Sequence, residues 1–261
     1  MNNSDFASKV NKLLENTSGE ISVLCHDFAM TEPLASVNPE AVMVSASIIK
    51  VPIMFYALDQ IMKGTHKLDE MVNVVKAVIL DDSVSFESGP RQASLQELLT
   101  WMIIYSDNTS TNSLLDIFGF DAVTGYCMSK GLNQTRLERK MLDFKAIDEG
   151  RNNYTSARDM YLLYKMFFDG GLLDEPRSAV AADILRGQRD KHRLARYVWE
   201  QDIVIAHKTG GLDYLSHDTG VFMHNGRKVF GGVFVQKADD IDGNPRLIGE
   251  IGKLIASYIK S

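Results

Sequence analysis

Residues 45–58 read SASIIKVPIMFYAL, and the interpretation of the whole chain starts from this stretch. After Lys50 the run is almost entirely apolar, which predicts a helix buried on all sides. Residues three apart on a helix share a face, so Ser47 and Lys50 are expected to point the same way. A serine and a lysine in dry surroundings at the head of a helix form a candidate nucleophile and base.

The candidate base is a lysine because nothing around Ser47 suggests a histidine–aspartate pair. A lysine accepts a proton only if its pKa is lowered, and the apolar neighbours Ile48 and Ile49 act in that direction. The positive end of the helix dipole also favours an alkoxide on Ser47. The S-x-x-K pattern is common on solvated helix faces, however, so it needs support from other motifs.

The order of predicted elements begins with a helix over residues 5–16 and a strand over residues 21–28. From Ser47 to about residue 185 the pattern is helical, with a capping box at Ser94-Leu95-Gln96-Glu97. Beyond residue 200, IVIAHKTG, DTGVFMHN and KVFGGVFVQ are short β-rich runs with turn residues between them. Residues 246–260 return to helical periodicity.

These elements predict one domain over residues 1–261, of mixed α/β (α+β) class. Residues 1–40 and 196–261 are expected to form an antiparallel sheet flanked by the terminal helices. Residues 41–195 are expected to form an all-α part inserted after the first strand.

Composition excludes several classes of function. The formal net charge of -6 and the scattered Lys and Arg residues give no basic surface for nucleic acid. The sequence starts without a cationic, apolar leader and has no membrane-spanning segment, which predicts a cytoplasmic protein unless a leader was removed. Histidine and cysteine spacing predicts no metal site. We expect a monomer that takes a small-molecule substrate and uses no cofactor.

Two further motifs follow the S-x-x-K pattern in order along the chain. Ser106-Asp107-Asn108 lies in a polar break between two helical runs, and Lys208-Thr209-Gly210 ends a predicted strand. Taken alone, the first could be an ordinary helix cap and the second a strand end leading into a turn. Their occurrence together in this order is far more specific.

With these three motifs the sequence resembles class A β-lactamases and the related penicillin-recognising DD-peptidases over essentially its whole length. The resemblance implies the β-lactamase/transpeptidase-like fold and an acyl-enzyme mechanism. By resemblance, Ser47 is the nucleophile, Lys50 its proton-transfer partner, and Ser106 a proton shuttle to the departing nitrogen. By the same resemblance, Asn108 binds an amide of the substrate's side chain, and Lys208 and Thr209 bind a substrate carboxylate. Gly210 and Gly211 let the substrate approach the strand closely. The backbone N–H groups of Ser47 and Gly211 are the oxyanion donors.

The sequence departs from the family in the loop that supplies the deacylating glutamate. When Arg139 is aligned with the family's arginine, Met141 falls on the glutamate and Lys145 on the asparagine. A thioether cannot accept a proton, so deacylation is expected to be slow. The aspartate that usually forms a salt bridge in this loop is also replaced, by Asn153-Tyr154. Glu138 or Asp143 is the candidate replacement carboxylate.

Three functions remain open at this point. The first is a class A β-lactamase-like serine hydrolase acting on β-lactams or related amides and esters. The second, favoured by Met141, is a penicillin-binding protein, DD-peptidase or small-molecule esterase on the same fold. The third is a non-catalytic binding module, because a fold alone does not fix a function.

Overall fold

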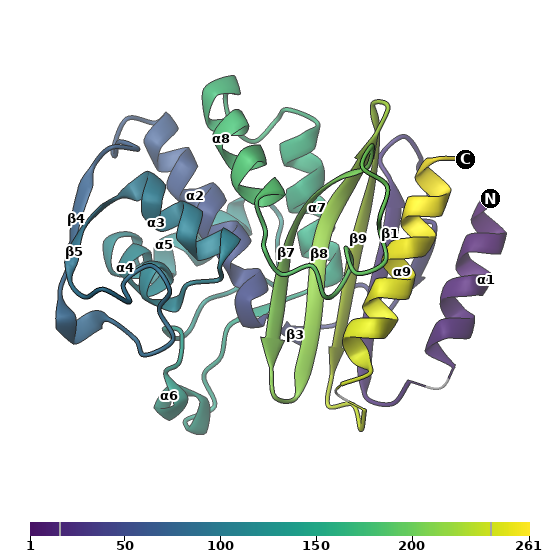
Figure 1. Cartoon of the computed structure of the whole chain (residues 1–261), viewed down its shortest axis with the longest axis horizontal. Coiled ribbons are helices and arrows are strands. Elements are labelled where there is room, and N and C mark those ends of the chain that lie inside the picture. The colour runs from purple at the N-terminus through teal and green to yellow at the C-terminus, as the bar shows by residue number, and fades with distance from the viewer. Residues whose placement is uncertain (16, 241) are drawn as a thin grey trace.

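A five-stranded antiparallel sheet brings the two ends of the chain together in the computed structural model (Figure 1), which describes residues 1–15, 17–240 and 242–261. The strand order is β2-β1-β9-β8-β7, so the first strand pairs with the last. The predicted antiparallel sheet is confirmed. Its strands are β1 (Glu20–Asp27), β2 (Ala35–Val37), β7 (Val204–Leu212), β8 (Leu215–His224) and β9 (Arg227–Gln236).

The β8–β9 hairpin is set by its two-residue turn. Asn225 and Gly226 have φ values of 47° and 80°, and the ladder runs directly from His224 opposite Arg227. A turn with positive φ at both central positions matches the right-handed twist of the strands, and Asn-Gly is the pair that adopts it most readily. The turn therefore fixes the register of the two longest strands.

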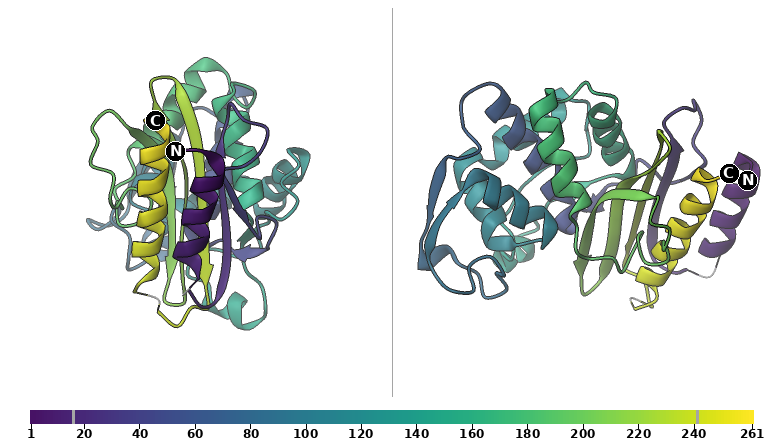
Figure 2. Two further views of the ribbon diagram at one scale, coloured as in Figure 1. Left: turned by 90° about the vertical axis from the view of Figure 1, so that its right-hand side faces the viewer. Right: turned by 45° about the horizontal axis from the view of Figure 1, so that its top comes forward.

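The terminal helices α1 (Asn3–Leu14) and α9 (Asn244–Ile259) lie side by side over one face of the sheet (Figures 1 and 2). Phe6 and Val10 of α1 are fully buried in a cluster with Ile251 and Ile255 of α9. Both helices are amphipathic, and their apolar stripes face the strands as the periodicity predicts. The predicted end of the first helix, residue 16, lies outside the described residues.

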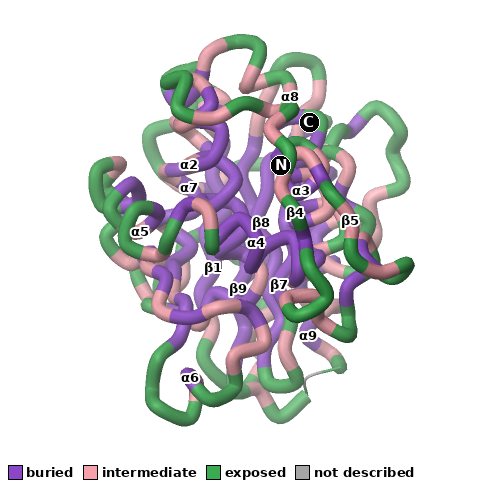
Figure 3. The backbone as a smooth tube through the Cα atoms, turned by 90° about the vertical axis from the view of Figure 1, so that its left-hand side faces the viewer, coloured by how far each residue is buried: buried purple, intermediate pink, exposed green. Residues whose placement is uncertain are grey.

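The opposite face of the sheet is covered by α7 (Ala157–Phe168), whose Tyr164 hydroxyl donates to Thr219 O at 3.1 Å. α7 belongs to the inserted part, and the rest of this part lies beyond it, with a backbone that is buried at the centre and exposed in the outer loops (Figure 3). Its other helices are η1 (Ala46–Ile49), α2 (Lys50–Met62), η2 (Lys76–Val78), α3 (Leu95–Ile104), α4 (Asn108–Phe118), α5 (Phe120–Ser129), α6 (Phe144–Asp148) and α8 (Glu175–Arg186).

Helix α2 is the centre of the inserted part. Ten of its thirteen residues are buried, including the whole run from Lys50 to Phe55. The predicted all-round apolar helix is therefore confirmed, although it begins at Lys50 and not at Ser47. Ser47 lies in the preceding 3₁₀ helix, a tighter turn that often leads into an α-helix.

The inserted part also contains strands that its helical periodicity did not predict. Two short antiparallel ladders pair β3 (Met43–Val44) with β6 (Tyr154–Thr155) and β4 (Met71–Val74) with β5 (Arg91–Ser94). Segments of two to four residues are too short to show a period of two. The predicted capping box is present, because the Ser94 and Glu97 side chains each bond to the other's backbone N–H. None of the described helices combines the length and the apolarity that crossing a bilayer requires.

The packing of α9 on the loop before β7 yields a stability prediction. A Cβ atom on Gly252 would lie 1.9 Å from Leu194 O. Gly252→Ala is therefore expected to lower the free energy of unfolding by about 1–3 kcal/mol, because helix and loop must separate. Urea denaturation measures the change. Lys253→Ala, exposed on the same helix, is the control, and equal stability of the two variants would contradict this packing.

Candidate functional site

Ser47 lies at the junction between the inserted part and the sheet. It is half-buried in η1 and lines two neighbouring hollows, of about 490 and 210 Å³. Within the described part of the chain its hydroxyl makes no hydrogen bond, so the oxygen is free to meet a substrate. β7 runs beside η1 because Gly210 has no side chain; a Cβ there would lie 3.1 Å from Ile48.

Lys50, the first residue of α2, is fully buried three positions beyond Ser47. Its Nζ donates to Ser106 O at 2.7 Å, Ser106 Oγ at 3.1 Å and Asn108 Oδ1 at 2.7 Å. Burial and then the nearby charge of Lys208 lower the pKa of Lys50 well below 10.5. These three acceptors are neutral, so none of them adds a negative charge beside the amine.

The Ser106 hydroxyl lies between two buried lysines. It is 3.1 Å from Lys50 Nζ and 3.2 Å from Lys208 Nζ. Burial lowers the pKa of Lys208 to about 7. Ser106 has a φ of 58°, an uncommon value for a residue with a side chain, and this conformation occurs where α3 ends and α4 begins. A hydroxyl in this position can exchange a proton with either amine.

Asp107 and Asn108 have different roles in the local structure. Asp107 caps α4 by accepting from Ser110 N at 2.7 Å, and it also accepts from the Ser83 hydroxyl at 2.8 Å, which ties down the 80–90 loop. Asn108 faces the site, where its Oδ1 accepts from Lys50 and its Nδ2 donates to Asp82 at 2.6 Å. The sequence did not indicate Asp82, which lines both hollows.

The end of β7 forms the other wall of the larger hollow. Thr209 and Gly211 line it, and Lys208 Nζ donates to Thr209 O at 2.8 Å. A Cβ atom on Gly211 would lie 2.7 Å from Arg193 Nη2, so the absence of a side chain admits the guanidinium. The structure thus brings together the three motifs, from η1–α2, the α3–α4 junction and β7.

Arg193 is a second charged residue of the site that sequence reasoning missed. It forms an ion pair with Asp190, and its Nε donates to Ser216 Oγ at 2.8 Å. The loop that carries it is anchored by Leu194, whose N–H donates to the buried Asp218 at 3.0 Å. No local motif surrounds Arg193, so only the tertiary structure could have revealed it.

Met141 lines the smaller hollow together with Ser47. The Asn112 side chain fixes its backbone by accepting from Met141 N at 2.8 Å and donating to Met141 O at 3.2 Å. Lys145, aligned with the family's asparagine, points into solvent. The position expected to hold a general base is therefore occupied by a thioether.

Glu138 and Asp143 are engaged elsewhere in the same loop. Glu138 pairs with Arg136 at 2.8 Å and accepts from Asn152 N at 3.2 Å. Asp143 caps α6 by accepting from Ala146 N at 3.0 Å. In this conformation neither residue is among those that line the two hollows at Ser47.

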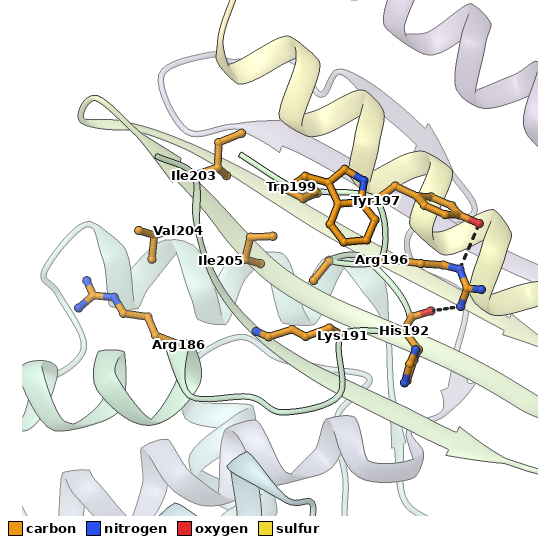
Figure 4. A pocket seen from close by; sticks show the side chains of 11 residues that line it. Arg186, Lys191, His192, Arg196, Tyr197, Trp199, Ile203, Val204 and Ile205 are labelled. Atoms are coloured by element: carbon orange, nitrogen blue, oxygen red, sulfur yellow. Dashed lines mark hydrogen bonds between the residues drawn. The ribbon is translucent and has the colours of Figure 1, made fainter. Parts of the chain in front are cut away.

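A third hollow, of about 710 Å³, lies at the start of β7, whereas the Lys208 motif lies near its end (Figure 4). Its wall includes Lys191, Arg196 and the exposed Trp199, and Arg196 Nε donates to the Tyr197 hydroxyl at 3.1 Å. It contains none of the predicted site residues. The volume of the hollows alone would therefore not have identified the site at Ser47.

Two β-lactamases are similar to the chain in sequence. A β-lactamase from Streptomyces fradiae is 31% identical over 169 residues, which are 62% of this chain and 55% of the relative. The extended-spectrum β-lactamase PER-1 from Pseudomonas aeruginosa is 23% identical over 85% of this chain and 77% of the relative. The chain thus spans little more than half of the Streptomyces protein.

Solved structures of the same fold cover nearly the whole chain. The TLA-3 extended-spectrum β-lactamase superposes with a TM-score of 0.91 at 19% identity, covering 100% of both chains. The protein PBP-A superposes with a TM-score of 0.88 at 21% identity, covering 98% of this chain and 96% of PBP-A. These similarities confirm the predicted β-lactamase/transpeptidase-like fold.

The family follows from the match of a whole-family sequence model, described as the β-lactamase enzyme family, to residues 5–259. This range includes most of α1, all five strands of the sheet, the inserted part and α9. The chain belongs to the β-lactamase enzyme family.

Proposed function

We propose that Ser47 is the nucleophile of this serine hydrolase and that it forms an acyl-enzyme with β-lactams or related amides and esters. The observation that carries the proposal is the Ser106 hydroxyl held within 3.2 Å of the amines of both Lys50 and Lys208, in a hollow that Ser47 lines. This arrangement supplies a base and a proton carrier without a histidine.

In the acylation step Ser47 Oγ attacks the substrate carbonyl carbon and its proton passes to neutral Lys50. The backbone N–H groups of Ser47 and Gly211 would hold the oxyanion. As the carbon–nitrogen bond breaks, Ser106 gives its proton to the departing nitrogen and is reprotonated from the lysine side. Lys208 and Thr209 suit a substrate carboxylate, and Asn108 suits an amide of the acyl side chain.

Deacylation distinguishes the leading function from the second one. Hydrolysis of the acyl-enzyme needs an activated water, and Met141 at the smaller hollow cannot accept a proton. This observation favours a penicillin-binding protein, DD-peptidase or esterase with a long-lived acyl-enzyme. Glu138 and Asp143 stay candidate bases if the loop changes path, and Asp82 is a further carboxylate at the site.

A non-catalytic binding module is the third function. A binding module would need the hollow but would not need two lysines with lowered pKa values. Nor would it need these lysines near Ser47, whose hydroxyl makes no hydrogen bond within the described part of the chain. Burying two such amines is costly and is typical of a site that moves protons. We therefore favour an enzyme.

Covalent labelling tests the nucleophile. Intact-protein mass spectrometry after mixing with benzylpenicillin is expected to show one acyl adduct on the wild type and none on Ser47→Ala. Ser106→Ala should form the adduct about 100-fold more slowly, because the proton carrier is lost. Ser257→Ala, on the exposed side of α9, is the control. An adduct on Ser47→Ala at the wild-type rate would exclude the assignment.

The lowered pKa of Lys50 predicts a pH dependence of acylation. Because the neutral amine is the active form, the rate at saturating substrate should rise with pH through this pKa and level off well below pH 10.5. Lys50→Arg, whose guanidinium keeps its proton, should lose at least about 100-fold at every pH. Stopped-flow measurements give both results, with the exposed Lys63→Arg as control. A Lys50→Arg rate equal to wild type would contradict the role of Lys50.

A carboxylate at position 141 should restore deacylation. Met141→Glu is expected to shorten the lifetime of the acyl-enzyme at least tenfold, since a general base contributes about 100-fold or more. Met141→Gln has nearly the same shape without a base and serves as the matched control. The decay of the adduct mass after removal of free penicillin measures the effect. Equal lifetimes in the two variants would show that the missing base does not limit turnover.

A further inference from the structure

Arg139 is a buried cation in the wall of the smaller hollow at Ser47. The residue lines this hollow of about 210 Å³, yet only 5% of it is exposed. An arginine keeps its charge at any physiological pH, so this charge must be satisfied inside the protein or by a ligand.

The protein gives this guanidinium only neutral partners. Nε donates to Asn152 Oδ1 at 2.8 Å and Nη1 donates to Lys140 O at 2.9 Å. Among the described residues, no carboxylate oxygen lies within 4.0 Å of it, and Nη2 has no hydrogen-bond partner. By contrast, the half-buried Arg136 and the exposed Arg151 of the same loop each pair with a glutamate.

The nearest acidic side chains are held by other groups. Asp143 caps α6, and Asp116 forms an ion pair with Lys140. Asp82 lines the hollow too, but it is exposed and accepts from Asn108. Among the described residues none forms an ion pair with Arg139, although burial lowers its pKa and the more distant charge of Asp143 acts to raise it.

The remaining wall of the hollow contains both apolar and polar residues. Met141, Leu142 and Ile147 are apolar, Asp82 and Asn108 are polar, and Ser47 lines both this hollow and the larger one. A chain of methylene groups that starts at the acyl carbon on Ser47 would contact the apolar side chains. Its far end would meet Arg139.

We propose that this hollow binds the acyl side chain of the substrate and that this chain ends in a carboxylate bound by the Arg139 guanidinium. The inference rests on the proposed function, since it assumes that Ser47 is acylated. A carboxylate matches the planar fork of a guanidinium and would be the ion-pair partner that the described residues do not supply.

The test compares penicillins that differ only in the end of the side chain. The test compounds are 6-aminopenicillanic acid acylated with glutaric, adipic or pimelic acid. Each is compared with the same penicillin in which only the side-chain carboxyl group is a methyl ester. For the side chain of best length, the second-order rate of Ser47 acylation should be about ten- to a hundredfold higher for the free carboxylate.

Asn152→Asp is the informative variant. The carboxylate keeps the oxygen that accepts from Arg139 Nε and from Asn153 N, and it adds the missing negative charge. The ratio of the acylation rate with the free carboxylate to that with the methyl ester should fall to near one, while the methyl esters react at the wild-type rate. Asn11→Asp, on the exposed side of α1, adds the same charge elsewhere and should retain the preference.

Each remaining outcome decides between the inference and the proposed function. If the wild type acylates Ser47 equally fast with acids and methyl esters at all lengths, the inference is wrong and the proposed function stands. A preference that persists in Asn152→Asp would assign it to another cation and overturn the role of Arg139. No labelling of Ser47 by any of these penicillins would overturn both.

Discussion

The site depends on two buried ammonium groups that share one hydroxyl. Lys50 comes from α2, Lys208 from β7, and Ser106 from the junction of α3 and α4, so this contact joins the inserted part to the sheet. Removing an ammonium from water costs several kcal/mol, and here the main acceptors are neutral. The lowered pKa values of the two lysines express this cost.

The rest of the fold holds these three groups in place. Asp107 secures the start of α4, and the apolar surroundings of α2 exclude water from Lys50. Gly210 lets β7 approach η1, while Gly211 admits Arg193. The site is thus built where backbone elements approach unusually closely, and the residues that permit this contribute no chemistry of their own.

The parts of the site that the sequence could predict are those encoded by local motifs. Two of the motifs, S-x-x-K and S-D-N, mark junctions between helices, whereas K-T-G lies within β7, which continues to Leu212 beyond its predicted end. Asp82 and Arg193 lie in loops without a motif, and their positions depend on contacts far away in sequence. For Arg139 the sequence contains a partial sign, because the loop's usual salt-bridge aspartate is replaced by Asn153-Tyr154, but Glu138 and Asp143 are near it along the chain and only the fold shows that neither pairs with it.

The elements of the fold follow the same division. Long helices with a full apolar stripe and the Asn-Gly hairpin are local, so their pattern predicts them. The two-residue strands β3 and β6 exist only because residues 43–44 and 154–155 meet in the folded chain. Ser47 falls in a 3₁₀ helix that the apolar pattern did not separate from the α-helix after it.

The pairing of β1 with β9 determines when the protein can fold during its synthesis. Glu20 lies opposite Gln236, so the edge of β1 that pairs with β9 stays unpaired until most of the chain has left the ribosome. The inserted part leaves the ribosome much earlier, but its apolar cluster includes Leu24 of β1 and Phe230 and Phe234 of β9. Until β9 is made, β1 can pair only with β2, and its other edge is exposed to wrong pairing.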